Sequence, residues 1–211
     1  MDDCRKIVAY FDFDGTISNR DTFIPFLVFV VGKITFLRKL PKLIPVLLRY
    51  WCKNITNEQA KQATLNILIH GYKQVFLEHK AKSFAISKLN KYIKPAVYAK
   101  LEWHREHKHT LVIVSANLGI YLRYWAHLHK IDHVIATEIE FVNSNVASGR
   151  LATHNCYGSE KVNRIENFLI DNKLTFCYSY GYGNSAGDYA MLNYVNEGYF
   201  VNGDYMRRWG L

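Results

Sequence analysis

The stretch that most constrains the fold of this chain is YFDFDGT at 10–16, where an apolar run ends in two aspartates and a glycine. Residues 7–11 have the length and β-forming composition of a strand that is buried on both faces. Such strands occur in parallel sheets, whose ligands bind beyond the carboxyl ends of the strands. Asp12 and Asp14 are also ordinary turn residues. Two like charges one residue apart repel each other unless a cation or another donor compensates them, which favours a functional site.

The remainder of the chain alternates between strand-like and helical segments. Strands are expected at 110–117 and 133–142, and a short hairpin at 143–151. Within 174–192 a further strand is expected to lead into a glycine-rich loop and a helix. The last strand is expected at 198–202. Strands that alternate with helices form right-handed βαβ units and a parallel sheet. The sequence therefore predicts an α/β fold with a doubly wound, Rossmann-like parallel sheet.

Between the first and second strands the chain shows helical patterns only. One of these helices is expected to begin at Thr56, with Gln59 as the partner of a capping box. We therefore expect an all-helical cap domain at 21–107, inserted after the first strand, and a core domain formed by 1–20 and 108–211.

The formal charge of +9 is unevenly distributed. Residues 32–100 contain 14 Lys and Arg against two acidic residues, a net +12, so the rest of the chain carries −3. Such an excess favours an anionic partner, either a phosphorylated substrate, acidic lipid headgroups or nucleic acid. The alternative is a solvated basic face with no partner. Since no recognised nucleic-acid motif is present, nucleic acid is not expected.

The cysteine pattern and the apolar runs bear on location. Cys4, Cys52, Cys156 and Cys177 have no CxxC spacing and are typical of reduced thiols in a cytoplasmic protein. The acidic start of the chain is unlike a secretory signal, and no apolar run reaches the roughly 18 residues of a spanning helix. We expect a cytoplasmic protein or one at the inner face of the membrane.

A polar group follows the end of each core strand. These groups are Asp12 and Asp14, Ser115 and Asn117, Lys161, and Asn184, Ser185 and Asp188. Each group alone is explained by a turn, a helix cap or a solvated charge. Because the carboxyl ends of parallel strands meet at one edge of a sheet, the set as a whole predicts a single site there.

In order and spacing this set resembles the haloacid dehalogenase superfamily of phosphohydrolases, in the branch that contains phosphoserine phosphatase and has a helical cap after the first strand. The resemblance covers nearly the whole chain. DFDGT at 12–16 is highly specific, GYGNSAGDYAML at 181–192 is moderately specific, and VSAN and EKV are weak alone. DFDGT followed by DTF, a basic apolar cap and GSEKV is most similar to the bacterial phosphatidylglycerophosphate phosphatases of this fold.

The resemblance implies a role for each residue at the strand ends. Asp12 would attack phosphorus and form an aspartyl-phosphate, and Asp14 would protonate the leaving group and then activate water. Ser115 and Lys161 would bind the phosphoryl oxygens. Gly15 would keep a side chain away from the phosphate.

The resemblance also implies Mg²⁺ as the cofactor. The ion would be held by the Asp12 carboxylate, the Asp14 backbone carbonyl and the loop residues Asn184 and Asp188. The family loop generally begins Gly-Asp, whereas here Asn184 follows Gly183. An amide contributes no charge, so a weaker metal site is expected unless Asp188 compensates.

The cap is expected to select the substrate. Asn117 and Asp21 are candidate substrate contacts, although capping of the next helix is the safer explanation for Asp21. Residues 21–53 interleave apolar stretches with Lys and Arg and end in an aromatic pair, which suits an anionic bilayer surface. Pro41 and Pro45 are expected to break this segment into short pieces. The alternative is that its apolar residues only pack the cap onto the core.

We therefore expect an Mg²⁺-dependent phosphomonoester hydrolase that acts on a lipid phosphate such as phosphatidylglycerophosphate. The first alternative is a phosphatase of a soluble metabolite such as phosphoserine, and the second is a non-catalytic binder of anionic membrane. The histidines at 104–109 and 127–133 are expected on polar faces near helix ends rather than in a metal site.

Overall fold

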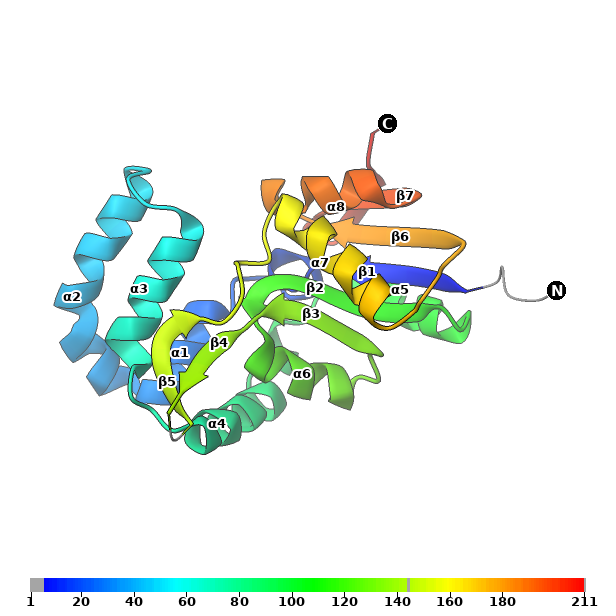
Figure 1. Ribbon diagram of the computed structural model, residues 1–211. Helices are drawn as coiled ribbons and strands as arrows, with labels where there is room; N and C mark the ends of the chain where they lie inside the picture. The colour runs from blue at the N-terminus through cyan, green and yellow to red at the C-terminus, as the bar shows by residue number, and fades with distance from the viewer. Residues whose placement is uncertain (1–5, 144, 211) are drawn as a thin grey trace.

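The computed structural model describes residues 6–143 and 145–210 and contains a six-stranded sheet with helices on both faces (Figure 1). The strands in spatial order are β3 (His133–Thr137), β2 (Thr110–Leu118), β1 (Ile7–Phe11), β6 (Tyr178–Gly183), β7 (Glu197–Asn202) and β8 (Tyr205–Arg208). The first five are parallel, and β8 pairs antiparallel with β7. The predicted doubly wound α/β fold is confirmed.

Strand β1 lies in the middle of the sheet and is covered on both sides. Val8 and Tyr10 face one apolar cluster, and Ala9 and Phe11 face the other. The helices α7 (Ser159–Asp171) and α8 (Tyr189–Tyr194) supply the first cluster, and α5 (Pro95–Glu106) and α6 (Gly119–Leu128) contribute to the second. A strand buried on both faces needs apolar residues at every position, which explains the uninterrupted run in the sequence.

Four helices follow the first strand before α5. They are α1 (Phe23–Val31), α2 (Lys33–Trp51), α3 (Asn57–Ile69) and α4 (Gln74–Ser87). The predicted capping box is confirmed, since Gln59 N–H donates to Thr56 Oγ1 and Thr56 N–H donates to Gln59 Oε1. Although α5 falls in the segment assigned to the cap, it packs on β2 beneath the sheet. Among the described residues, no helix is long and apolar enough to cross a membrane.

The expectation that two prolines break the segment after α1 is wrong. Helix α2 is continuous through Pro41 and Pro45. A proline removes the hydrogen bond to the carbonyl four residues earlier, here those of Leu37 and Pro41. Leu37 and both prolines lie on the exposed side of α2, where water can satisfy these carbonyls. The actual break is at Gly32, whose φ of +81° ends α1.

The predicted strand at 133–142 is two strands that belong to different sheets. After β3 the chain bends at Glu138, and β4 (Ile139–Val142) pairs with β5 (Val146–Leu151) in a separate antiparallel hairpin. This hairpin packs on α3, and a Cβ on Gly149 would lie 2.6 Å from the Cα of Asn66. A hairpin from the second half of the chain therefore packs against the helical insertion. The domain boundaries after residue 20 and before residue 108 remain a prediction.

The cysteines show no disulfide within the described residues. Cys52 and Cys156 are free thiols, whereas Cys4 lies outside the described residues. The thiol of Cys156 is buried beside the helix that carries Lys161, and burial raises its pKa.

Candidate active site

The site is built at the carboxyl end of β1. Asp12 is the first residue after the strand, and its N–H donates to the carbonyl of Tyr182 on β6 at 2.9 Å, which continues the sheet. The chain then makes a wide turn at Phe13–Ile17. Gly15 in this turn has φ +80°, a conformation that favours glycine.

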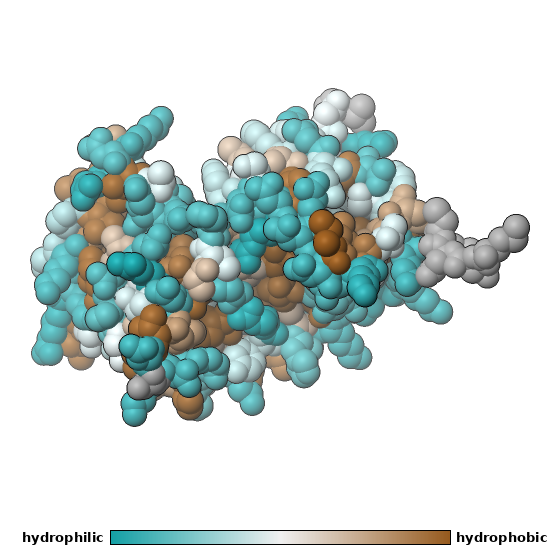
Figure 2. Space-filling view, in the orientation of Figure 1, coloured by the Kyte–Doolittle hydropathy of each residue, from teal (hydrophilic) through white to brown (hydrophobic). Residues whose placement is uncertain are grey.

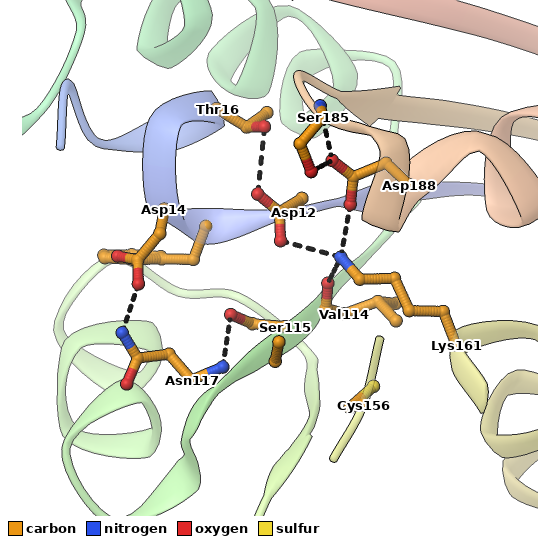
Figure 3. A network of polar contacts seen from close by, with 12 residues as sticks. Asp12, Asp14, Thr16, Val114, Ser115, Asn117, Cys156, Lys161, Ser185 and Asp188 are labelled. Atoms are coloured by element: carbon orange, nitrogen blue, oxygen red, sulfur yellow. Dashed lines mark hydrogen bonds and ion pairs between the residues drawn. The ribbon is translucent and has the colours of Figure 1, made fainter. Parts of the chain in front are cut away.

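Lys161, on the first turn of α7, is at the centre of the polar network (Figure 3). Its ammonium group donates to Asp12 Oδ1 at 2.7 Å, to Asp188 Oδ1 at 2.6 Å and to the carbonyl of Val114 at 2.6 Å. The side chain is 1% exposed. All three protons of the ammonium group are therefore used, and one buried cation lies between two carboxylates.

The charge states of Lys161 and Asp12 depend on their burial and on the charges beside them. Burial alone would lower the pKa of Lys161, but Asp12 and Asp188 outweigh it and raise that pKa, so the lysine is charged. Burial and the neighbouring Asp188 raise the pKa of Asp12 to about 6, although Lys161 acts in the opposite direction. Asp12 is therefore mostly ionised at neutral pH, as a nucleophile requires.

Asp14 has different partners from Asp12. The N–H and hydroxyl of Thr22 donate to Asp14 Oδ1 at 3.2 and 2.7 Å, and the side-chain amide of Asn117 donates to Oδ2. Burial and the nearby Asp21 raise the pKa of Asp14 to about 7, despite these hydrogen bonds. This carboxyl group is half protonated near neutral pH, which suits a group that both donates and accepts a proton.

A small cavity of about 150 Å³ opens over these groups. Its lining residues come from β1, β2, α7 and the loop before α8 in the core, and from α3 and the residues before α1 in the insertion. They are Asp12, Asp14, Asp21, Asn57, Lys61, Ser115, Ala116, Asn117, Tyr157, Lys161, Ser185, Gly187 and Asp188. Four carboxylates and two lysines give the lining a formal charge of −2. An anionic phosphate group would be repelled from this cavity unless a cation accompanied it.

The oxygen atoms beside the cavity suit such a cation. The hydroxyl of Thr16 lies 3.0 Å from both Asp12 Oδ2 and Asn184 Oδ1, but it has one proton and can donate to only one of them. Whichever of Asp12 Oδ2 and Asn184 Oδ1 does not accept this proton keeps a free lone pair close to the Thr16 hydroxyl. Within the described ranges no group of three His, Cys, Asp or Glu could hold a metal ion. The donors present, a carboxylate and an amide, fit Mg²⁺, which keeps several waters and few protein ligands.

Most of the predicted site residues line this one cavity. Ser115 and Asn117 follow on β2, and the hydroxyl of Ser115 accepts the N–H of Asn117. Asp21 borders the cavity, is exposed, and accepts the N–H of Phe23, the first residue of α1, although the N-cap position itself is held by Thr22.

Two predicted residues lie elsewhere than expected. Gly15 and Asn184 line a neighbouring cavity of about 740 Å³, and a Cβ on Gly15 would collide with the side chain of Asn184. The missing side chain thus makes room for Asn184. In Asp188, Oδ2 is fully occupied, since it accepts the N–H groups of Asn184 and Ser185 and the Ser185 hydroxyl, whereas Oδ1 accepts from Lys161.

Sequence reasoning predicted Asp21 but missed the residues that α3 of the insertion contributes. Lys61 on α3 donates to the carbonyl of Ala116 at 2.5 Å and to Asn155 Oδ1 at 2.9 Å, and burial lowers its pKa. Asn57 lies one turn earlier on the same helix face and accepts from Asn155 Nδ2 at 2.9 Å. The signal was available, since these two polar residues are four apart in a helix with a defined start.

The histidine prediction is wrong for one residue. His104 is fully buried on α5, where Nε2 lies 2.9 Å from the Tyr182 hydroxyl and Nδ1 lies 2.7 Å from His109 Nδ1. Burial and the neighbouring His109 lower the pKa of His104 to about 3, so it is neutral.

A parallel sheet with two aspartates after its first strand, a buried lysine and a helical insertion defines a class of hydrolases. The chain belongs to the haloacid dehalogenase-like hydrolase family, whose model matches residues 9–193. It is therefore a hydrolase by family, and the predicted superfamily is confirmed.

The chain is also similar to individual proteins, in sequence or in fold. The chain is 29% identical over 194 residues to the protein CicA of Caulobacter vibrioides, covering 92% of this chain and 85% of CicA. Its fold is similar to that of a Bordetella pertussis protein of unknown function, with a TM-score of 0.77 and 22% identity over 92% of this chain and 88% of that one. A probable phosphoserine phosphatase from Vibrio cholerae has a TM-score of 0.67 and 12% identity over 92% of this chain and 55% of that chain.

Proposed function

We propose that the protein is a Mg²⁺-dependent phosphomonoester hydrolase that forms an aspartyl-phosphate on Asp12. The observation that carries this proposal is the arrangement of Asp12 and Asp14 at one cavity with different partners. Asp12 is paired with a buried ammonium group, whereas Asp14 is held by neutral donors from Thr22 and Asn117. The first carboxylate is poised as a nucleophile and the second as an acid.

In the first step, a carboxylate oxygen of Asp12 forms a bond to phosphorus while the bond from phosphorus to the alcohol oxygen breaks. Asp14 gives its proton to the departing alkoxide. In the second step, Asp14 takes a proton from water, the water oxygen attacks phosphorus, and the bond to Asp12 breaks to release phosphate. The hydroxyl of Ser115 donates to a phosphoryl oxygen, and the positive charge of Lys161, whose three protons are already used, stabilises the negative charge through space.

The metal ion would be held by Asp12, Asn184 and the backbone carbonyl of Asp14. When bound, it would neutralise the excess negative charge of the lining and polarise the phosphoryl group. Asp188 accepts four hydrogen bonds, three of them on Oδ2, so we assign it to the positioning of Lys161 and of the loop at 184–185 rather than to the metal. This changes the ligand set expected from the sequence.

For the substrate class we propose a lipid phosphate monoester, such as phosphatidylglycerophosphate. The support is the exposed apolar side of α2, which ends beside the cavity at Tyr50, whose hydroxyl accepts from Asn57 Nδ2 at 3.1 Å. Only the phosphorylated headgroup would enter the cavity. The small volume and polar lining favour a second candidate, a soluble phosphate ester such as phosphoserine.

The reaction is tested with p-nitrophenyl phosphate. We expect hydrolysis that needs Mg²⁺ and is lost in Asp12→Asn, and acid-quenched wild type should carry an alkali-labile phosphate on Asp12 by mass spectrometry. Hydrolysis that persists in Asp12→Asn would refute the mechanism, and a complete lack of hydrolysis would favour the non-catalytic alternative. The substrate class is tested with lysophosphatidate and phosphatidylglycerophosphate in mixed micelles against phosphoserine and sugar phosphates. Turnover of the soluble esters alone would exclude the lipid.

A further inference from the structure

Helix α2 has an apolar face that no described residue covers. We call it the apolar stripe of α2; its residues are Ile34, Leu37, Pro41, Ile44, Leu47, Leu48 and Trp51. They recur mainly at alternating intervals of three and four, which places them on one side of the helix. Trp51 is 84% exposed and Ile34 is 69% exposed. In Figure 2, brown apolar side chains are visible in the region of α2, among hydrophilic ones.

The stripe is unlike the rest of the insertion. Phe26 and Leu27 of α1 are fully buried, so α1 packs the insertion together as an ordinary core helix does. In α2 only Leu43 is buried, and the helix is held on α3 by the side opposite the stripe. Contiguous exposed apolar surface of this kind marks an interaction site.

A row of basic residues flanks the stripe. Arg38, Lys42, Arg49 and Lys53 are exposed and follow one another at intervals of four, seven and four residues. None of them forms an ion pair with another described residue. Residues 33–53 contain no Asp or Glu. This surface therefore has no countercharge of its own.

We propose that the apolar stripe and its basic flank dock on the surface of an anionic lipid bilayer. The stripe would enter the boundary between headgroups and acyl chains, with Trp51 as its anchor, while the flank contacts acidic headgroups. A second copy of this chain fits less well, because two copies of α2 would bring together apolar faces with no acidic residue to meet the basic ones. The surface chemistry of the helix thus favours a bilayer.

The docked helix would also position the catalytic cavity. The end of α2 is joined to the cavity wall through the hydrogen bond between Tyr50 and Asn57, and Asn57 and Lys61 lie on successive turns of α3. A bilayer in contact with Trp51 would therefore lie next to the entrance. Docking on a bilayer is separate from the hydrolytic reaction, so vesicle binding is measured without substrate.

The test is co-sedimentation of the full chain with vesicles of phosphatidylcholine alone or mixed with an equal amount of phosphatidylglycerol. We expect binding to the anionic vesicles only, weakened by salt. Trp51→Ala should weaken it about tenfold, and the pair Arg38→Gln and Lys42→Gln about thirtyfold. Ile170→Ala is the matched control, because Ile170 is 73% exposed on α7, and it should bind like wild type.

Two further readouts distinguish the alternatives. Hydrolysis of p-nitrophenyl phosphate in solution should be equal in all of these variants, which shows that they are folded and separates docking from catalysis. Absence of binding, equal binding to neutral and anionic vesicles, or equal binding by Trp51→Ala would overturn the proposal. A wild-type dimer that Trp51→Ala converts to a monomer, without vesicle binding, would assign the stripe to a second copy instead.

Discussion

Gly15 and Asn184 are so close that a Cβ on residue 15 would lie 2.3 Å from the side-chain nitrogen of Asn184. The turn after β1 and the loop after β6 are therefore fitted to each other. This fit holds the amide oxygen of Asn184 beside the hydroxyl of Thr16 and the carboxylate of Asp12.

Gly15→Ala should break this fit. Gly15 and Gly71 have nearly the same φ, +80° and +79°, but a Cβ on Gly71 would meet nothing within 4 Å. Gly71→Ala therefore measures the cost of a positive φ alone, about 1 kcal/mol. We expect Gly15→Ala to cost a further 1–3 kcal/mol, roughly, in urea unfolding, and to weaken Mg²⁺ binding in calorimetry. Equal effects of the two substitutions would show that the contact with Asn184 does not matter.

Asn184→Asp should strengthen the metal site. A carboxylate adds a charge to the ligand set, so we expect Mg²⁺ affinity to rise about tenfold in isothermal titration. Asn202→Asp adds the same charge in the neighbouring cavity and is the control. If both variants bind Mg²⁺ as wild type does, Asn184 is not a ligand.

Asp14→Asn should separate the two chemical steps. p-Nitrophenolate leaves without protonation, so formation of the phosphoenzyme should persist, whereas its hydrolysis loses the base and should slow by about a hundredfold or more. Rapid-quench measurements should show a burst of p-nitrophenol followed by slow turnover. Turnover that is as fast as in wild type would remove Asp14 from the mechanism.

Lys161→Met should leave two buried carboxylates without their cation. Removal of one partner from a buried ion pair costs about 3–5 kcal/mol, so we expect a loss of this size in the free energy of unfolding at pH 7. Lys173→Met, at an exposed lysine, is the control and should change stability little. A small effect in Lys161→Met would mean that water replaces the ammonium group.

His104 should make folding sensitive to acid. The pKa of His104 is about 3 in the folded chain, and a histidine in an unfolded chain titrates near 6.5. Between these values the unfolded state binds more protons, so stability falls as the pH falls. We expect a loss of about 2 kcal/mol between pH 7 and pH 5 in urea titrations, and a smaller loss in His104→Gln. The same slope in both proteins would show that other groups cause it.

The parallel core could be predicted because β1 is apolar at every position, β2 is apolar over most of its length, and both end in polar residues. The bend at Glu138 could not be predicted, because 133–142 has the composition of one continuous strand. The bend results from tertiary contacts. The carboxylate of Glu138 pairs with Arg123 on α6, and the backbone N–H of Glu138 donates to the hydroxyl of Thr153. Strand β8 was missed because its residues are mostly exposed and polar.

The site could be predicted where the order of strands and helices alone brings residues together. Residues at the carboxyl end of a parallel strand, or at the start of a helix that follows it, converge by topology, which is why Asp12, Asn117 and Lys161 could be placed in one site. The contribution of Lys61 depends on how the insertion packs against the core. The hydrogen bonding of Asp188 depends on loop geometry that residue types do not encode.

The hairpin that packs on α3 is part of the same stretch of chain that leads to Lys161. Asn155 lies on this stretch and accepts a hydrogen bond from Lys61. An outward swing of α3 would therefore pull on the polypeptide just ahead of Lys161. Admission of a substrate and alignment of the charged groups are mechanically linked through this tether, so the enzyme would be least organised for chemistry when it is most open.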